Sequence, residues 1–319
     1  MAHKILVVGN FFPSVLTDLK KSFDVMHLQN SAEFDAASDA DLAGVEGFAS
    51  FGWAPAAVID RMPVLKVISS FGVGYDGVAA DHAVSKGIMV GHTPDVLNDD
   101  VANMTIAMIL STMRRLVEQE KYLRDGRWAK EGNAPLTRSI AGKTVGIVGL
   151  GRIGEAIAHK LSVFNCTTVY HSRNQKTHVD YQYYGSLLDM ANDSDVLVVI
   201  TPGGPATDKL ISREVMEALG PEGTLINVAR GSVVDQTEMI KALQDGRLGS
   251  AGLDVFEDEP NVPEELIAMD HVVLLPHVAS ATWETRQAMS DRVVENMKSY
   301  FENGAPVSTI PECAHLIKS

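Results

Sequence analysis

The stretch KTVGIVGLGRIGEAIA, residues 143–158, decides the fold. A short apolar run rich in β-branched residues leads into the pattern Gly-x-Gly-x-x-Gly at Gly149, Gly151 and Gly154, and a helical pattern follows. A strand, a glycine turn and a helix in this order are typical of a dinucleotide-binding unit. Gly149 allows the tight turn, Gly151 lets the backbone approach a pyrophosphate, and Gly154 lets the helix pack closely on the strand.

The next expected strand ends without the acid that an NAD site requires. It lies in TTVYHSRNQK, residues 167–176, where Asp or Glu would bind the ribose hydroxyls of NAD. Ser172, Arg173 and Lys176 stand there instead. A hydroxyl and two cations favour the 2′-phosphate of NADP, which an acid would repel. The sequence therefore predicts NADP(H) in preference to NAD(H), and the alternative is a solvated polar loop.

Composition and charge narrow the class of protein. The chain has 319 residues, of which 45% are hydrophobic and 21% charged, and this length favours two globular domains. The net charge of −14 argues against nucleic acid or an anionic membrane as a partner. An acidic protein that binds an anionic small molecule needs locally placed cations, which gives weight to the cations beside the glycine turn.

The cysteine content, the first residues and the length of the apolar runs predict a cytoplasmic protein without a metal site. Cys166 and Cys313 are too few for a disulfide framework, and no Cys/His spacing indicates a metal site. The first residues run straight into a strand-like segment with no signal-peptide pattern. No apolar run is long enough to span a membrane. We therefore expect neither metal nor membrane, and a reducing cytoplasm.

Strand-like and helical segments alternate in two blocks, which predicts an α/β protein with two parallel sheets. The first block lacks a glycine fingerprint, and its strands are expected at 4–10, 23–28, 45–51, 65–71 and 88–93. A long helix at 98–116 separates the blocks. The second block has nearly continuous apolar strands, as in a sheet covered on both faces, at 143–150, 167–172, 195–201, 223–229, 251–256 and 271–277.

The last helical stretch, residues 283–304, is expected to return to the first block. The first domain is then discontinuous, with residues 1–98 and 286–319, and residues 99–285 form an inserted nucleotide-binding domain.

Three strands of the second block lead to ionisable residues at one edge of the sheet. Ligands of open α/β sheets bind at the carboxyl ends of the strands, and Arg230, Glu259 and His277 follow three such ends. This set suits hydride transfer to a 2-oxo acid. Arg230 would bind the carboxylate, His277 would donate the proton, and Glu259 would hold the imidazole and favour its protonated form. Asp254 would accept a hydrogen bond from the nicotinamide carboxamide.

The first block contributes a second candidate. SSFGVGYDG, residues 69–77, reads as a strand ending in a glycine turn. The N–H groups of Val73 and Gly74 could bind a substrate carboxylate, and the alternative is a plain tight turn. Phe51 and Trp53 follow another strand and either face the substrate or belong to the core.

These stretches together resemble the D-2-hydroxyacid dehydrogenases, and within them the glyoxylate/hydroxypyruvate and hydroxyphenylpyruvate reductases. The resemblance spans nearly the whole chain in the family's order and is carried by SSFGVGYD, TPDVLNDDVA, GKTVGIVGLGRIG, INVARGSVVD, GLDVFEDEP, LLPHVASAT and ETR. It implies two Rossmann-like domains, the substrate domain being flavodoxin-like, an active site in the interdomain cleft, and a homodimer formed by the nucleotide domains.

The resemblance also implies roles for single residues. Arg230, Glu259 and His277 match the catalytic positions, and Val73 and Gly74 match the loop that binds the substrate carboxylate. The further cofactor contacts that it implies are Arg152, Ile153, Thr201, Pro202, Val228, Ala229 and Asp254. The chain departs from the family's commoner wording around Pro202, and it has Ala279 where relatives often have glycine.

The sequence therefore predicts an NADPH-dependent reductase of small 2-oxo acids, with glyoxylate and hydroxypyruvate as expected substrates. An aryl pyruvate such as hydroxyphenylpyruvate is the first alternative. An NAD-dependent dehydrogenase working in the oxidative direction and a nucleotide-sensing binding protein without catalysis are the others.

Overall fold

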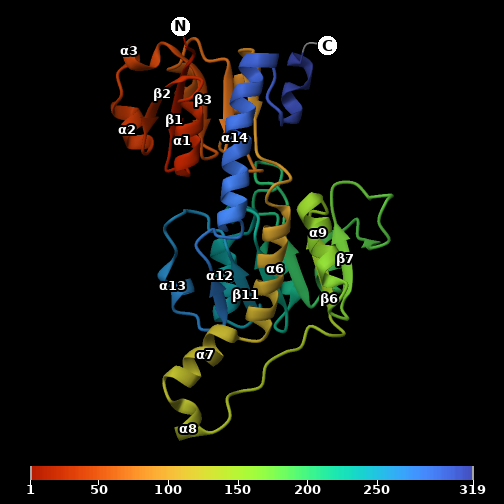
Figure 1. The fold of residues 1–319 in the computed structure, drawn as a ribbon. Helices are drawn as coiled ribbons and strands as arrows, with labels where there is room; N and C mark the ends of the chain where they lie inside the picture. Colours follow the sequence, from red (N-terminus) through yellow and green to blue (C-terminus); the bar gives the residue numbers. More distant parts are fainter. Residues whose placement is uncertain (1, 318–319) are drawn as a thin grey trace. The chain divides into compact units, whose positions relative to one another are not determined.

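The computed structural model describes residues 2–317, which fold into two compact units (Figure 1). Unit 1 combines the residues up to Leu97 with those from Thr282 onward, and unit 2 is Asn98–Ala281. The sequence places the second boundary after residue 285. The structure places it earlier because Thr282 is the N-cap of the last helix, where its Oγ1 accepts the N–H of Thr285 at 3.2 Å.

Unit 1 is built on a parallel sheet with the strand order β2-β1-β3-β4-β5. This is the flavodoxin-like order, in which the direction of winding reverses between β1 and β3. The strands are β1 (Lys4–Val8), β2 (Asp24–Leu28), β3 (Val45–Ser50), β4 (Val67–Ser70) and β5 (Met89–Gly91). The helices are α1 (Pro13–Leu19), α2 (Ser31–Ala36), α3 (Asp39–Leu42), α4 (Ala56–Asp60), α5 (Ala80–Ser85) and α14 (Trp283–Asn303), and a 3₁₀ segment follows at Pro311–Leu316.

Buried hydrogen bonds tie the C-terminal segment into unit 1. The Asn296 side chain on α14 donates to the carbonyl of His92 at 2.9 Å and accepts the N–H of Ser308 at 2.9 Å. Ser69 on β4 donates to the carbonyl of Val293 at 3.2 Å. Because these polar groups are buried, they are satisfied only when α14 lies on this sheet.

Unit 2 is built on a longer parallel sheet with the order β12-β11-β10-β9-β6-β7-β8. The strands are β6 (Thr144–Val148), β7 (Thr167–His171), β8 (Gln182–Tyr183), β9 (Val196–Val199), β10 (Thr224–Asn227), β11 (Ser250–Leu253) and β12 (Val272–Leu274). The helices are α6 (Asn98–Met113), α7 (Leu116–Arg124), α8 (Arg127–Glu131), α9 (Arg152–Leu161), α10 (Leu187–Asn192), α11 (Arg213–Leu219), α12 (Gln236–Gln244) and α13 (Glu264–Ile267), with a 3₁₀ turn at Gly231–Val233. Two doubly wound parallel sheets confirm the predicted fold class.

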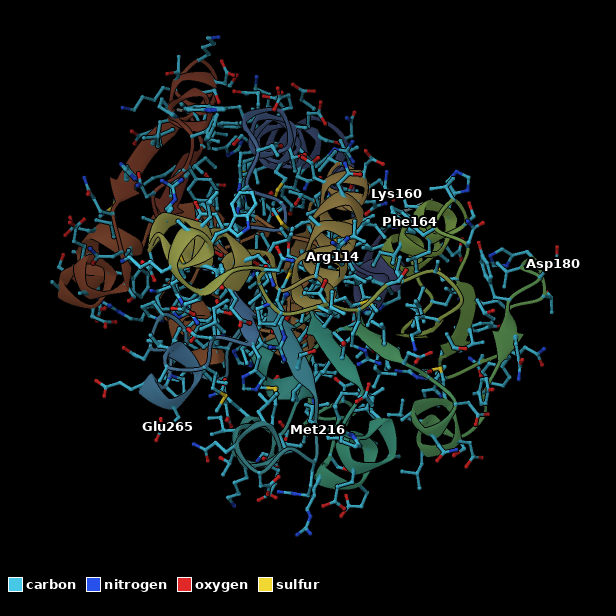
Figure 2. The ribbon with its side chains drawn as sticks, turned by 90° about the horizontal axis from the view of Figure 1, so that it is seen from below. Arg114, Lys160, Phe164, Asp180, Met216 and Glu265 are labelled. Atoms are coloured by element: carbon cyan, nitrogen blue, oxygen red, sulfur yellow. The ribbon has the colours of Figure 1, made fainter. Side chains whose placement is uncertain are left out.

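Both faces of the unit 2 sheet are covered, which explains its continuous apolar strands. Val196 and Val198 of β9 enter the core cluster that includes residues of α6 and α9, whereas Leu197 and Val199 enter the cluster on the other face. Helices α6 and α9 pack against each other (Figure 1). An ion pair of 2.7 Å between Lys160 on α9 and Asp99 in the first turn of α6 joins them (Figure 2 labels Lys160).

The long helix predicted at 98–116 ends earlier in the structure. Helix α6 stops at Met113, and Arg115 adopts a left-handed conformation with φ 46°, so that α7 begins as a separate helix. Within residues 2–317 no helix is long and apolar enough to cross a membrane.

The glycine turn after β6 generates a stability prediction. A Cβ on Gly154 would lie 2.3 Å from the carbonyl oxygen of Gly149, whereas a Cβ on Gly151 would meet nothing within 4 Å. Gly154→Ser should lower the free energy of unfolding by about 1–3 kcal/mol, because the strand and the helix must move apart. Gly151→Ser should change it by less than about 0.5 kcal/mol, because serine suits the N-cap of α9. Denaturant unfolding measures both free energies. Equal losses in the two variants would contradict the assignment of the close strand–helix contact to Gly154 alone.

Candidate active site

The glycine turn lies at the point where the winding of the unit 2 sheet reverses. Gly149 follows β6 with φ 102°, and a Cβ on it would lie 2.9 Å from both the N and the Cα of Thr201, which follows β9. Gly151 is the N-cap of α9, no side chain caps the helix, and the space in front of its Cα is open. A pyrophosphate therefore fits at the N-terminus of α9, where helical N–H groups attract anions.

The predicted selectivity residues form a loop directly after β7. Arg173 is exposed, Ser172 and Lys176 are partly exposed, and the Ser172 hydroxyl donates to the carbonyl of Asn174 at 2.7 Å. The segment that continues from this loop runs along the edge of unit 2 (Figure 2 labels Asp180). The loop thus carries Ser172 and the two cations at the carboxyl end of β7, and its binding of a 2′-phosphate stays a prediction.

The structure brings the three predicted catalytic residues together at the same edge of the sheet. His277 Nδ1 lies 2.8 Å from Glu259 Oε2, and Glu259 Oε1 accepts the N–H of Phe256 at 3.1 Å. Arg230 donates to the carbonyl of Ala229 at 2.7 Å. The side chains of His277 and Glu259 are 48% and 34% exposed. Both therefore remain accessible to a substrate while they contact each other.

The ionisation of Glu259 follows from its neighbours. Partial burial acts to raise the pKa of this carboxyl, but the hydrogen bond and charge of His277, the N–H of Phe256 and the charge of Arg230 outweigh it and hold the pKa below its ordinary value. Glu259 is therefore a carboxylate at neutral pH, and it offers a negative charge to the imidazole.

Asp254 organises the turn that carries His277. It is 1% exposed; one carboxylate oxygen accepts the N–H of Val278 at 2.8 Å, the other that of Ala279 at 2.9 Å, and its carbonyl accepts the N–H of His277 at 2.9 Å. His277 is left-handed with φ 52°, a conformation that needs such support. Burial raises the pKa of Asp254, and the two N–H bonds oppose that shift. The predicted nicotinamide contact stays a prediction.

Asn227 organises the backbone around Arg230, as Asp254 does around His277, and sequence reasoning missed it. Asn227 is 1% exposed; its side-chain oxygen accepts the N–H of Ala229 at 3.1 Å and its amide donates to the carbonyl of Arg230 at 2.9 Å. The signal was present in INVARGS, because a polar amide at the end of an otherwise apolar strand must find partners.

The other predicted cofactor contacts in unit 2 lie at the same edge. Val228 and Ala229 are buried directly after β10, whereas Thr201 and Pro202 follow β9 and are partly or fully exposed. Arg152 is exposed and Ile153 partly buried in the first turn of α9. Within residues 2–317 no group of three or more His, Cys, Asp or Glu side chains could hold a metal.

The predicted substrate loop lies at the carboxyl edge of the unit 1 sheet. His92 Nδ1 lies 3.0 Å from the carbonyl oxygen of Val73, and Thr93 Oγ1 accepts the N–H of Gly72 at 3.0 Å. These contacts hold the backbone around Val73 and Gly74 in one conformation. Fixed N–H groups are what a carboxylate-binding loop needs.

The two aromatic residues after β3 have different environments. Phe51 is 44% exposed, and its ring centroid lies 4.6 Å from that of Phe11 and 4.5 Å from that of Phe71, both of which are buried. Trp53 packs edge-on against the fully buried ring of Phe34 at 5.5 Å. Phe51 therefore presents a ring supported from behind, whereas Trp53 serves the packing of unit 1.

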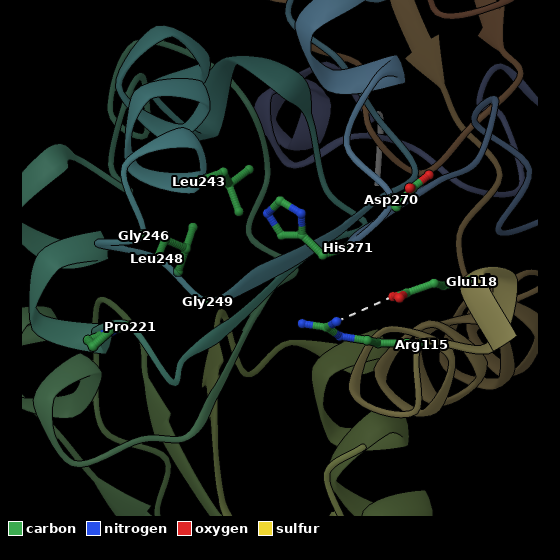
Figure 3. A pocket seen from close by; sticks show the side chains of 9 residues that line it. All are labelled: Arg115, Glu118, Pro221, Leu243, Gly246, Leu248, Gly249, Asp270 and His271. Carbon is green, nitrogen blue, oxygen red and sulfur yellow. Dashed lines mark hydrogen bonds and ion pairs between the residues drawn. The ribbon is translucent and has the colours of Figure 1, made fainter. Parts of the chain in front are cut away.

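A cavity of about 340 Å³ lies elsewhere in unit 2 (Figure 3). Gly249 and His271 in its wall immediately precede β11 and β12, so it lies at the amino ends of strands whose carboxyl ends lead to the catalytic residues. Burial and the charge of Arg115 lower the pKa of His271. None of the predicted site residues lines this cavity, and it is separate from the catalytic set.

Comparison with known proteins identifies the family. Residues 106–279 match the family model of the D-isomer specific 2-hydroxyacid dehydrogenase, NAD binding domain. A hydroxyphenylpyruvate reductase from Plectranthus scutellarioides is 49% identical over 277 residues, which cover 87% of this chain and 88% of the relative. A glyoxylate/hydroxypyruvate reductase A from Arabidopsis thaliana is 47% identical over 287 residues, which cover 89% and 91%.

A solved structure agrees over nearly the whole chain. The NADPH-dependent glyoxylate/hydroxypyruvate reductase from Sinorhizobium meliloti, in complex with NADP and malonate, superimposes with a TM-score of 0.94 at 45% identity and covers 98% of both chains. With the glycine turn and the Arg230, Glu259 and His277 set in place, this chain belongs to the family of D-isomer specific 2-hydroxyacid dehydrogenases.

Proposed function

We propose that this protein reduces small 2-oxo acids, glyoxylate and hydroxypyruvate foremost, with NADPH to the 2-hydroxy acids, which are D-2-hydroxy acids wherever C2 becomes a stereocentre. The observation that carries the proposal is the joint placement of Arg230, Glu259 and His277 at the sheet edge that also holds the glycine turn. Two relatives are glyoxylate/hydroxypyruvate reductases. The protein from Arabidopsis thaliana is 47% identical to this chain, and the protein from Sinorhizobium meliloti is 45% identical.

The reduction adds a hydride to the C2 carbon and a proton to the C2 oxygen, which gives a hydroxyl group. NADPH, when bound at the glycine turn, would supply the hydride. Arg230, whose charge acts on Glu259 at the same sheet edge, would bind the substrate carboxylate and polarise the carbonyl with its guanidinium. His277 donates the proton from Nε2, because Nδ1 faces Glu259. Glu259 keeps the ring oriented through its contact with Nδ1 and presents a carboxylate to it.

The remaining contacts extend this assignment. We assign the nucleotide to Gly149, Gly151, Arg152, Ile153, Gly154, Thr201, Pro202, Val228, Ala229 and Asp254. The N–H groups of Val73 and Gly74 would bind the substrate carboxylate.

The cofactor preference rests on the loop after β7. Each charge-assisted hydrogen bond from Arg173 or Lys176 to a 2′-phosphate would contribute about 1.5–3 kcal/mol, so either cation alone shifts the preference towards NADPH about ten-fold or more. The Ser172 hydroxyl donates its proton to the carbonyl of Asn174, so Ser172 contributes by ordering the loop that carries the two cations. An NAD site would instead need a carboxylate here.

A second substrate class is favoured by Phe51. Its exposed ring, supported by Phe11 and Phe71, is an apolar surface beside the strand ends of unit 1. Such a surface suits the aromatic side chain of an aryl pyruvate, with which it can stack. The 49% identity to a hydroxyphenylpyruvate reductase supports the same alternative.

We also propose a homodimer located in the cytoplasm. Large apolar side chains are exposed on and beside α7 and α8, namely Leu116, Val117, Leu123, Trp128 and Leu136. These side chains belong to two neighbouring helices and the segment that follows them, and exposed apolar side chains gathered in one part of a chain are typical of a protein interface. A sedimenting mass of one 34.4 kDa chain would exclude the dimer. The cytoplasmic location rests on the low cysteine content, and cell fractionation tests it.

The first test compares cofactors and acceptors. We expect NADPH oxidation to exceed NADH oxidation about ten-fold or more in kcat/KM, with glyoxylate or hydroxypyruvate ahead of pyruvate and 4-hydroxyphenylpyruvate.

His277→Ala should lower kcat about 10²–10⁴-fold, because the proton donor is lost, and leave NADPH binding unchanged. Steady-state absorbance measures the oxidation rates, and calorimetric titration measures NADPH binding.

Three outcomes would contradict the proposal. Equal rates with both cofactors would indicate that the loop after β7 is a solvated polar loop that does not bind the 2′-phosphate. Unchanged activity in His277→Ala would reject His277 as the acid. NADPH binding without turnover of any acceptor would favour a nucleotide-sensing protein.

A second test concerns pH. Reduction should decline as the pH rises, because the acid must carry its proton. Glu259 is ionised at neutral pH, since its pKa is lowered, so Glu259→Gln removes a negative charge from His277 Nδ1. The alkaline decline of kcat/KM should then move to lower pH. Glu257→Gln is the control, because it removes an exposed carboxylate of the same loop, whereas the carboxylate in contact with His277 Nδ1 is that of Glu259. An unmoved profile in Glu259→Gln would show that this carboxylate does not act through the imidazole.

A third test separates the substrate classes. If Phe51 binds an aryl group, Phe51→Ala should lower kcat/KM for 4-hydroxyphenylpyruvate about ten-fold and leave glyoxylate unchanged, because glyoxylate has no side chain to stack. Trp53→Phe is the matched control, since Trp53 packs on Phe34. An equal loss with both acceptors would assign Phe51 a structural role only.

A further inference from the structure

Two tyrosine hydroxyls hold the loop between Ser172 and Lys176. The hydroxyl of Tyr170 on β7 accepts the N–H of Lys176 at 2.8 Å, and its oxygen lies 3.5 Å from the carbonyl oxygen of the same residue. The hydroxyl of Tyr183 on β8 donates to the carbonyl of Ser172 at 3.2 Å. Each end of the loop is therefore fixed by one tyrosine.

The two tyrosines form a unit of their own. Tyr170 and Tyr183 are direct partners in the parallel pairing of β7 with β8, and their ring centroids lie 5.4 Å apart. Tyr170 is completely buried, and Tyr183 is partly buried. A buried hydroxyl needs a hydrogen-bond partner, and the one that Tyr170 finds is the backbone of Lys176. The edge strand β8 is two residues long, so the pair forms much of its contact with the sheet.

The position of the loop matters because the cations lie on it. Arg173 and Lys176 have long side chains, which lose conformational freedom when they bind an anion. A backbone that is already fixed at Ser172 and Lys176, with an inner bond from Ser172 Oγ to the carbonyl of Asn174, reduces the ordering that a 2′-phosphate must impose. NADH has no 2′-phosphate and gains nothing from this order.

We propose that Tyr170 and Tyr183 are positioning residues that set the preference for a 2′-phosphorylated cofactor by holding the loop at Ser172–Lys176. The inference rests on the proposed NADPH preference and adds the residues that produce it without contacting the cofactor. It goes beyond the cations, because the same cations on a loosened loop would select less well.

The experiment uses Tyr170→Phe, Tyr183→Phe and the double variant of the full chain. Each removes a hydroxyl and keeps the ring. We expect KM for NADPH to rise about five- to ten-fold in the double variant, with KM for NADH and both kcat values unchanged within error. Calorimetric titration should show the same loss of affinity for adenosine 2′,5′-bisphosphate and none for AMP.

Tyr184→Phe is the matched control. Tyr184 lies next to Tyr183 in sequence, but its hydroxyl donates to Asp193 at 2.9 Å and does not contact the loop. Its removal should leave the NADPH to NADH ratio of kcat/KM unchanged. Thermal unfolding of every variant separates loop effects from a general loss of stability, and Tyr183→Phe keeps the test open if the buried Tyr170→Phe fails to fold.

The outcomes separate the inference from the proposed function. A wild-type protein that prefers NADPH, with double and Tyr183→Phe variants that keep the full preference, would overturn the positioning role alone. Equal losses for NADPH and NADH would overturn it as well, because they indicate a structural role. A wild-type protein without NADPH preference would overturn the proposed preference, and the positioning role with it.

Discussion

The close approach of β6 and β9 at their carboxyl ends is the constraint on which unit 2 depends. No side chain fits between Gly149 and the backbone of Thr201, and none fits between Gly154 and the carbonyl of Gly149. The two contacts place the first turn of α9 over the crevice where the winding of the sheet reverses. Because a helix N-terminus there attracts phosphates, the packing of a strand against a helix also creates the nucleotide site.

The catalytic edge depends on buried polar groups that bind backbone rather than substrate. Asp254 holds three successive N–H groups from His277 to Ala279, and Asn227 holds the backbone on both sides of the Arg230 peptide. Buried groups of this kind are satisfied in only one arrangement of the loops. Arg230 and His277 are thereby fixed at neighbouring strand ends, while Glu259 reaches His277 from the loop after β11.

Net charge and local charge act at different distances in this protein. A chain with a net charge of −14 repels anions over its surface, yet both the cofactor and the acid substrate are anionic. Attraction must therefore come from a few cations and N–H groups at short range. Arg230 is held by the backbone that Asn227 organises, and Arg173 and Lys176 lie on the loop that Tyr170 and Tyr183 hold. Fixed neighbours allow single cations to act against the overall charge.

The sequence by itself determined the features that depend on neighbouring residues. Residues 143–158 predict strand, turn and helix, because glycine spacing and apolar periodicity are local properties. Arg173 and Lys176 predict a 2′-phosphate site for the same local reason, since they stand where an NAD site has an acid, and this role stays a prediction. Only the tertiary structure decided which partner each side chain finds. Phe51 and Trp53 are two residues apart and chemically alike, yet one ring is exposed and the other packs on Phe34. The strand β8, the bonds of Asp254 and the tyrosine pair likewise arise from residues distant in sequence, whose contacts exist only after packing has brought them together.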